Sequence, residues 1–167
     1  MHGGAVWPRC RHGIMVAGAL VVAGATACAQ DQSAATATDT IVARKSVMEA
    51  LSDKMDDIEG AISAGKINLA EAHAAADTIS IFLMAFPHLF PPATNQWKPG
   101  GGRDPVTDTS ASPDVWTGFA NFYQDATAAS KSAFAASRAQ TEGDLKTAIA
   151  RLRSQCNACH TAYLKTE

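Results

Sequence analysis

One pentapeptide near the C-terminus limits the possible folds and functions of this chain more than any other feature: Cys156-Asn157-Ala158-Cys159-His160. A C-x-x-C-H run is the attachment site of a c-type haem. The two thiols are spaced to add across the two vinyl groups of one porphyrin, and the histidine that follows can ligate the iron. A covalently held haem dominates the chemistry of a small protein, so these five residues predict most of the function.

Three other uses of the motif remain open at this point. A structural zinc site needs four ligands, usually from two paired clusters, and the only other cysteines are Cys10 and Cys28 near the N-terminus. A thioredoxin-like redox pair lies near a βαβ pattern, and no segment has the pattern of strands. A disulfide between Cys156 and Cys159 would not explain why His160 follows directly. Haem attachment therefore accounts best for both cysteines and the histidine.

The N-terminal residues have the composition of an export signal. Arg9 and Arg11 lie in a stretch without acidic residues, residues 14–24 form the apolar run IMVAGALVVAG, and the small residues Ala25-Thr26-Ala27-Cys28-Ala29 follow. This order is that of a secretory signal peptide. The apolar run is shorter than the about 20 residues of a transmembrane helix, which argues against a retained membrane anchor.

Two cleavage positions fit this signal, one after Ala29 and one after Ala27. We expect residues 1–29 to be removed. Cleavage before Cys28 would give a lipoprotein, but Ala25 stands where such signals usually carry a leucine-like residue. Export predicts a periplasmic location, because c-type cytochromes mature outside the bacterial cytoplasm, and it leaves no transmembrane helix in the mature chain.

Composition limits what the mature chain can do. Removal of 29 of the 167 residues leaves 138, which is enough for one domain with a single core. Two of the 14 basic residues and none of the 16 acidic ones are removed, so the formal charge becomes −4. The mature chain lacks the basic surface expected for nucleic acid or a membrane surface. Residues 30–38 are rich in Ser, Thr and Ala without periodicity, which predicts a flexible tail.

Four segments of residues 39–167 carry apolar residues at the three- and four-residue spacing of an amphipathic helix. They begin at about Asp39, Asn68, Ser112 and Thr141, and the last three starts carry helix-capping patterns. A loop rich in Pro and Gly, residues 87–111, separates the second helix from the third. Four such helices predict an all-α, antiparallel four-helix bundle, whose core is a usual place for a cofactor.

Several motifs then resemble those of class II cytochrome c, the cytochrome c′ family. CNACHTAY resembles the C-x-x-C-H-x-x-Y that closes family members, and SPDVW resembles the start of their third helix. FPHLFPP resembles their Pro-rich turn after the second helix, and ARKSVM resembles their first-helix pattern. The low-spin, Met-ligated cytochrome c-556 branch is the most similar. The resemblance implies an antiparallel four-helix bundle with one covalently bound haem c.

The residues of the motif and one methionine would hold the haem. Cys156 and Cys159 would form thioethers, and His160 would give its imidazole nitrogen to the iron. The resemblance places Met48 on the distal side, where its sulfur would be the sixth ligand. The alternative for Met48 is core packing, which is the role expected of Met55 on the same apolar stripe.

Further residues are assigned by the resemblance or remain as alternatives. Arg44 is expected to bind a haem propionate, and Lys45 beside it is expected to contact the haem. His73 or His88 could replace Met48 as sixth ligand. The family commonly has Arg or Lys four residues after the haem histidine, whereas this chain has Leu164, which favours plain electron transfer over proximal gas binding. The aromatic side chains are expected to pack the core and the haem edge: Trp116, Phe119, Phe122 and Tyr163.

These predictions combine into a periplasmic c-type cytochrome that carries one electron between redox partner proteins. A five-coordinate, high-spin cytochrome c′ that binds nitric oxide or carbon monoxide is the alternative if Met48 leaves the iron free. A haem-free helical module with a disulfide or metal at Cys156 and Cys159 is the second alternative. We expect a monomer or homodimer, and no pattern for hydrolysis, phosphate binding or acid–base catalysis predicts an enzyme.

Overall fold

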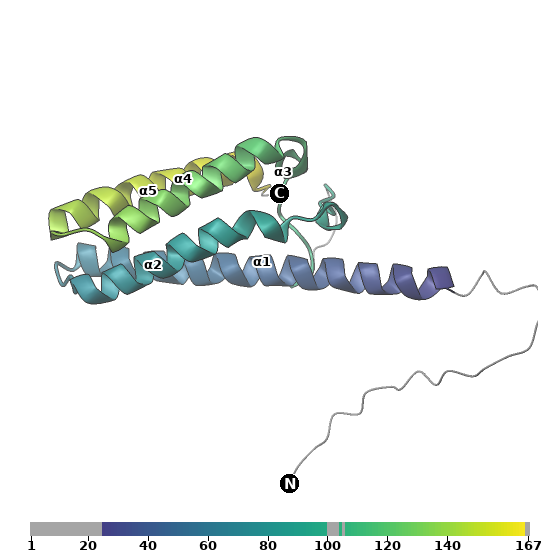
Figure 1. The fold of residues 1–167 in the computed structure, drawn as a ribbon, viewed down its shortest axis with the longest axis horizontal. Helices are drawn as coiled ribbons and strands as arrows, with labels where there is room; N and C mark the ends of the chain where they lie inside the picture. Colours follow the sequence, from purple (N-terminus) through teal and green to yellow (C-terminus); the bar gives the residue numbers. More distant parts are fainter. Residues whose placement is uncertain (1–24, 100–103, 105, 166–167) are drawn as a thin grey trace, which may run out of the picture.

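The computed structural model describes residues 25–99, 104 and 106–165, with side chains from residue 36 onward. It contains four long helices and three short ones: α1 (Ala25–Ser63), α2 (Leu69–Ala85), η1 (Phe86–Leu89), η2 (Pro92–Thr94), α3 (Asp114–Thr117), α4 (Phe119–Ser137) and α5 (Glu142–Tyr163). The long helices form an antiparallel four-helix bundle (Figure 1). The prediction of an all-α bundle is confirmed, and extended pairing within the described ranges is limited to one isolated bridge, Ala111 with Leu164.

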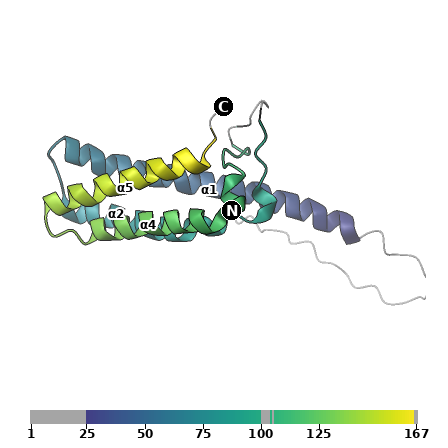
Figure 2. The ribbon, with the colours of Figure 1, turned by 90° about the horizontal axis from the view of Figure 1, so that it is seen from above.

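The helices pack in chain order around the bundle. Helix α2 lies against α1 and α4, and α5 lies mainly against α4. Seen from above, α1 and α5 flank the remaining side, and the N-terminal part of α1 extends beyond the other helices (Figure 2). Across that side Arg153 of α5 forms a two-pronged ion pair with Glu59 of α1, at 2.9 Å from Nε and 2.6 Å from a terminal nitrogen.

Local sequence signals explain where the helices begin and end. Gly65 has a φ of 64°, which ends α1 in the left-handed conformation that glycine adopts at low cost. Asn68 caps α2, because its side-chain oxygen accepts from the backbone N–H groups of Ala70 and Glu71 at 3.1 and 3.4 Å. Thr141 caps α5 by accepting from the Asp144 N–H at 3.1 Å.

The apolar side chains gather into two clusters. The first, the bundle core, fills the space between the four long helices and includes Leu51, Ile58, Ile79, Ala133 and Leu152. The second, the aromatic cluster, lies at the end of the bundle where α2 ends and α4 begins and consists of Phe86, Phe90, Val115 and Phe122. Val47 and Met48 of α1 pack against both clusters, so α1 passes the place where the clusters meet.

The structure differs from the sequence predictions in two places. Helix α1 begins at Ala25 rather than near Asp39, so residues 30–38, predicted as a tail, have a helical backbone. The predicted third helix is interrupted at Gly118, where α3 ends and α4 begins, in keeping with the low helix propensity of glycine. The predicted export signal lies mostly in residues 1–24, outside the described residues, and its cleavage stays a prediction.

Within the described part of the chain, one helical segment is long and apolar enough to cross a membrane. It runs from Leu69 to Leu89 with a mean hydropathy of 1.3. This segment packs between α1 and α4, and its inward-facing side chains belong to the bundle core. Length and composition of this kind are also typical of a core helix in a helical bundle.

Candidate haem site

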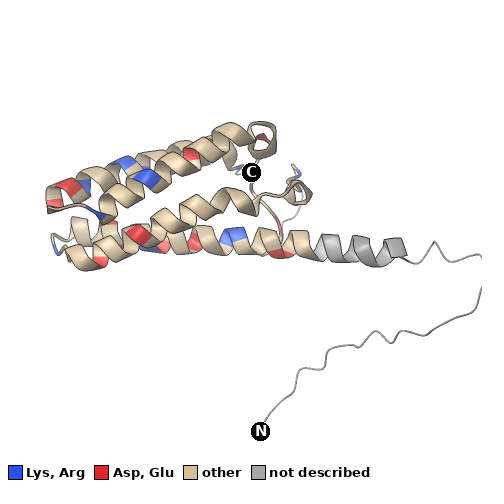
Figure 3. Cartoon of the chain, in the orientation of Figure 1, with Lys and Arg blue, Asp and Glu red and all other residues tan. Residues whose placement is uncertain are grey.

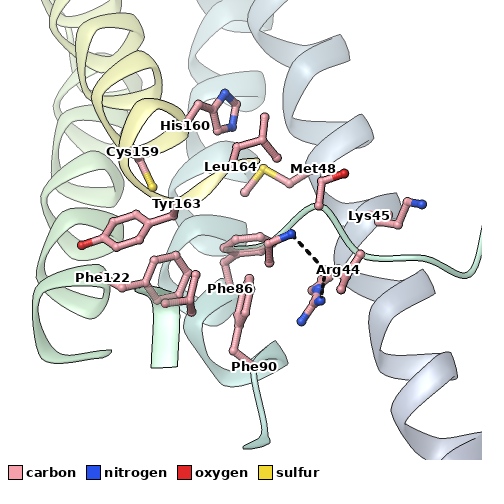
Figure 4. Close-up of a pocket in the computed structure, with 14 residues that line it drawn as sticks. Arg44, Lys45, Met48, Phe86, Phe90, Phe122, Cys159, His160, Tyr163 and Leu164 are labelled. Atoms are coloured by element: carbon pink, nitrogen blue, oxygen red, sulfur yellow. Dashed lines mark hydrogen bonds between the residues drawn. The ribbon is translucent and has the colours of Figure 1, made fainter. Parts of the chain in front are cut away.

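A cavity of about 300 Å³ opens at the junction of the two clusters. It is lined by α1, by η1 and Phe90, by residues 109–111, by α3, by α4 and by the end of α5, and most of its lining is apolar. A smaller cavity of about 80 Å³ adjoins it and shares five lining residues with it, namely Met48, Phe86, Phe122, Cys159 and His160. The two cavities together make one cleft, which we call the haem cleft (Figure 4).

Helix α5 brings the C-x-x-C-H motif to this cleft. Leu145, Ile149 and Leu152 are buried on its inner face, and they orient the helix so that the next turns place the cysteines on the same side. Cys156 packs against the bundle core and Cys159 against the aromatic cluster. Both thiols are free and partly buried, and burial raises the pKa of each, that of Cys159 to about 11.

Met48 and His160 line the cleft from opposite sides. Their side chains extend from α1 and α5 toward the same space (Figure 4). The His160 ring reaches solvent at the open side of the cleft, but the surrounding protein lowers its pKa below 6.5, first by desolvation and then by the charge of Arg153. A lowered pKa favours the neutral imidazole, which is the form that ligates a metal. Met48 and His160, which lie 112 residues apart in the sequence, therefore line the same cleft.

Aromatic side chains form the inner wall of the cleft. The ring of Phe122 is 1 % exposed and lies 4.8 Å from that of Phe90 and 5.2 Å from that of Tyr163, measured between centroids. Phe86 packs edge-on against Phe90 at 5.0 Å. The predicted packing role is confirmed for Phe122 and is wrong for Phe119, which is 39 % exposed because it lies on the outer face of α4.

Arg44 is buried beside the cleft, at 3 % exposure. Its guanidinium donates to the Thr94 hydroxyl at 3.0 Å, to the Thr94 carbonyl at 3.4 Å and to the Thr109 hydroxyl. Its charge lies 4.6 Å from the centre of the Phe90 ring and 5.7 Å from that of Trp116. Arg44 therefore ties the loop between α2 and α3 to α1, next to Met48.

No carboxylate of the described residues pairs with Arg44, and its neighbours are neutral. Desolvation lowers the pKa of its guanidinium from 12.5 to about 10. A buried cation without a counter-charge is costly, so the site favours an anionic group beside it. Lys45, the next residue, donates to the Asp108 carbonyl at 3.0 Å and also lines the cleft.

The segment after the motif closes one side of the cleft. The Ser112 N–H donates to the Tyr163 carbonyl, and the Lys165 N–H donates to the Ser110 carbonyl, each at 2.8 Å. These bonds flank the bridge between Ala111 and Leu164 and hold residues 109–112 against the end of α5. The same loop is held to α1 by Arg44, so one strap of backbone connects the two helices that carry Met48 and His160.

The alternatives raised by the sequence find less support in this arrangement. His73 and His88 are not among the residues that line the haem cleft. The described residues contain no group of three or more His, Cys, Asp or Glu side chains that could hold a metal ion by themselves. Cys156 and Cys159 are free thiols rather than a disulfide. Sequence reasoning missed Thr94, Thr109 and the ion pair of Arg153, because all three depend on contacts between distant segments.

Fold and cleft together define a helical bundle built to hold a flat apolar cofactor beside a C-x-x-C-H motif. A family model described as Cytochrome C' matches residues 39–164. The chain belongs to the cytochrome c′ family, and the predicted class is confirmed. Haem c, held covalently, is the cofactor of this family, and its members are mainly electron carriers or gas binders of the periplasm. No curated protein sequence matches the chain.

Solved structures share the fold at low sequence identity. A cytochrome c′ from Rhodopseudomonas palustris is 24% identical with a TM-score of 0.65, covering 78% of this chain and 98% of its own. Oxidised cytochrome c556 from R. palustris is 22% identical with a TM-score of 0.58, covering 74% and 96%. A cytochrome c′ described by its ligand-controlled dimer dissociation is 19% identical with a TM-score of 0.66, covering 78% and 97%. A monomer or homodimer is consistent with that relative.

Proposed function

We propose that this chain is an exported one-electron carrier whose haem iron is ligated by His160 and Met48. The observation that carries the proposal is that both side chains line one cleft from opposite helices, with Cys159 beside them and Cys156 in the adjoining cavity. An imidazole and a thioether are a ligand pair that cytochromes c use, and the thioether raises the potential. These two side chains would hold the iron in both redox states, so little rearrangement would accompany electron transfer.

The chemistry of the residues in the cleft fits haem c. Cys156 and Cys159 are three residues apart on one helix face, which suits two thioether bonds to one porphyrin, and the wall opposite is aromatic. Bound haem supplies one-electron exchange between ferrous and ferric iron. Cys156, Cys159, His160 and Met48 would hold the group, and the apolar lining of the cleft would exclude water from it.

The buried charge of Arg44 supports the same assignment. Haem carries two propionates, and a carboxylate next to Arg44 would supply the counter-charge that the described residues do not. We propose that Arg44 binds a propionate while keeping its bonds to the loop threonines, and that Lys45 is a second, more exposed contact. Leu164 lines the cleft in place of the basic residue common in the family, so this position adds no charge beside His160.

A pair of matched substitutions tests the ligand assignment. Met48→Leu removes the sulfur and keeps nearly the same volume. Met55→Leu makes the same change two turns further along α1, where Met55 is 3 % exposed and lines only the smaller cavity. Absorption spectra of the periplasmically matured protein should be low-spin for the parent and for Met55→Leu, and carbon monoxide should leave the reduced parent unchanged. Met48→Leu should become high-spin and should bind carbon monoxide.

The same spectra decide between the proposed functions. A parent protein with high-spin bands that shift on addition of carbon monoxide would replace electron transfer by gas binding at an open distal position. A Met48→Leu protein that stays low-spin would contradict the ligand assignment and direct attention to another side chain. Absence of a haem absorption band in matured protein would remove both functions and return the motif to a disulfide or metal role.

The remaining assignments follow from the same proposal. We propose that the N-terminal segment directs export and is removed at Ala27 or Ala29, which N-terminal sequencing of the purified protein tests directly. We propose that the chain is a carrier and not an enzyme. Its reactions would then be electron exchanges with redox partner proteins.

A further inference from the structure

Large apolar side chains are exposed together on the outer face of α2 and α4. Ile81 is 58% exposed, Met84 64%, Tyr123 41% and Phe119 39%. His88, also exposed, lies in η1 directly after α2, and its ring lies 6.1 Å from that of Tyr123 on α4. The Tyr123 ring lies 6.4 Å from that of Phe119. We call these five residues the apolar patch.

The apolar patch lies on two stretches of the sequence without formal charge. Residues 78–97 and 115–124 contain no Lys, Arg, Asp or Glu. The corresponding ends of α2 and α4 are tan in Figure 3, whereas charged positions appear along the remainder of the long helices. Surfaces that meet only solvent usually carry scattered charges, and a contiguous apolar patch marks an interaction site. The matching surface of a partner would therefore be uncharged as well.

The patch is connected to the haem cleft through the aromatic cluster. The Phe119 ring lies 6.1 Å from that of Phe122, which lines the cleft, and Phe122 in turn lies 6.3 Å from Phe86. A partner seated on the patch would thus be separated from the cleft by a layer of packed aromatic rings. A partner at this position would lie close enough to the cleft for electron exchange. Folding stability alone does not require an apolar patch there.

The size of the patch favours a transient complex over a stable dimer. The exposed fractions of its four large apolar side chains add up to about two fully exposed side chains. At roughly 200 Å² per large side chain, this corresponds to on the order of 400 Å². A stable complex buries about 800 Å² per partner, whereas weak electron-transfer encounters are smaller.

We propose that the apolar patch is the docking surface for a redox partner protein whose own contact face is apolar and uncharged. The inference rests on the proposed function, since it assumes that the bound haem exchanges electrons. Association through such a surface depends little on ionic strength, because few charges are screened. It depends strongly on the apolar side chains at the centre of the contact.

The test uses the haem-loaded protein with two redox proteins as probes. One is a blue copper protein with an uncharged apolar docking face, and the other is a basic cytochrome c with a ring of lysines. The bimolecular rate constant is measured by stopped-flow absorbance at low and high salt. The variant Ile81→Glu/Met84→Glu places two charges in the patch. Ala150→Glu, which places a charge on an exposed position of α5 away from α2, is the control.

We expect a rate constant with the blue copper protein that is nearly independent of salt. The double variant should lower it roughly tenfold or more, while Ala150→Glu leaves it unchanged. An unchanged rate in the double variant would overturn the proposal, as would a faster, strongly salt-dependent reaction with the basic cytochrome. Sedimentation equilibrium that finds a parent dimer dissociated by the double variant would assign the patch to a second copy and also overturn it.

Failure of the proposed function is recognised separately. A parent without a low-spin haem spectrum, or one that exchanges electrons with neither probe nor with a small reductant, contradicts the function before the patch is tested. Ile81 and Met84 do not line the haem cleft, so the double variant should keep the absorption spectrum of the parent. An unaltered spectrum with a lowered rate constant isolates the effect on docking.

Discussion

Replacement of Phe122 by alanine should be one of the most destabilising changes in this protein. Phe122 is 1 % exposed, and its ring lies within 6.3 Å of four other rings, those of Phe86, Phe90, Phe119 and Tyr163. Truncation of a buried phenylalanine costs about 3–5 kcal/mol in lost burial and in the cavity that remains. Phe122 already borders the haem cleft, so the new space would join the cleft and not collapse.

The matched control is the same substitution at Phe134, further along the same helix. Phe134 is 50% exposed, and burial of a whole phenylalanine contributes about 1.5–3 kcal/mol, so its truncation should cost about 1 kcal/mol. If Phe122→Ala costs about 4 kcal/mol, the two variants should differ by about 3 kcal/mol. At roughly 3–4 °C per kcal/mol for a domain of this size, their thermal midpoints should lie about 10 °C apart.

Denaturation in guanidinium chloride, followed by circular dichroism of the haem-loaded proteins, measures these costs. The covalently attached haem stays on the unfolded chain, so the comparison contains no separate equilibrium of haem dissociation. A cost below about 1 kcal/mol for Phe122→Ala would refute the argument, because it would mean that the aromatic cluster does not carry the packing assigned to it. Equal costs for the two variants would refute it as well.

Three further predictions follow from single interactions. Glu59→Gln should cost about 1 kcal/mol in the free energy of unfolding, less at high salt, since its ion pair with Arg153 is partly exposed; double-mutant cycles measure this coupling. Arg44→Met should lower the thermal midpoint of haem-loaded protein more than that of haem-free protein. Without haem the buried cation costs about 3 kcal/mol for a pKa lowered from 12.5 to about 10, and a propionate would offset that cost. An equal effect on both forms would contradict propionate binding. Burial, with nearby Asp125, raises the pKa of Tyr163 above 10, so folding favours the protonated phenol and stability should fall as pH rises past 10. Tyr163→Phe should lose the later component of the tyrosinate absorbance titration and this alkaline loss of stability.

Much of the fold could be predicted because its signals are local. Asn68 and Thr141 occupy cap positions that any helix in their place would use, and the structure confirms both. The inner face of α5 follows from the spacing of its apolar residues, which are buried as expected. The interruption at Gly118 and the extension of α1 to Ala25 were not predicted, since periodicity continues through a break and says little about helix ends.

The sequence predicted which residues line the cleft, but not the residues that hold them in place. Met48, Cys159 and His160 were named from sequence, and the structure brings all three to one cleft. The threonines that hold Arg44 carried no signal, because a hydroxyl becomes a partner only when the chain folds back on itself. The exposure of Phe119 was likewise hidden, since an aromatic residue at helical spacing is usually buried.

The sequence by itself determined the chemistry of this protein. Cys156, Cys159 and His160 lie within five consecutive residues, and one turn of helix is enough to present them to a single porphyrin. The tertiary structure decided what surrounds that motif. It brought the sulfur of Met48 from a distant helix to the same cleft, buried the Arg44 charge beside it and left the apolar patch facing solvent. Those relations depend on how four helices pack, and packing joins residues that no local pattern connects.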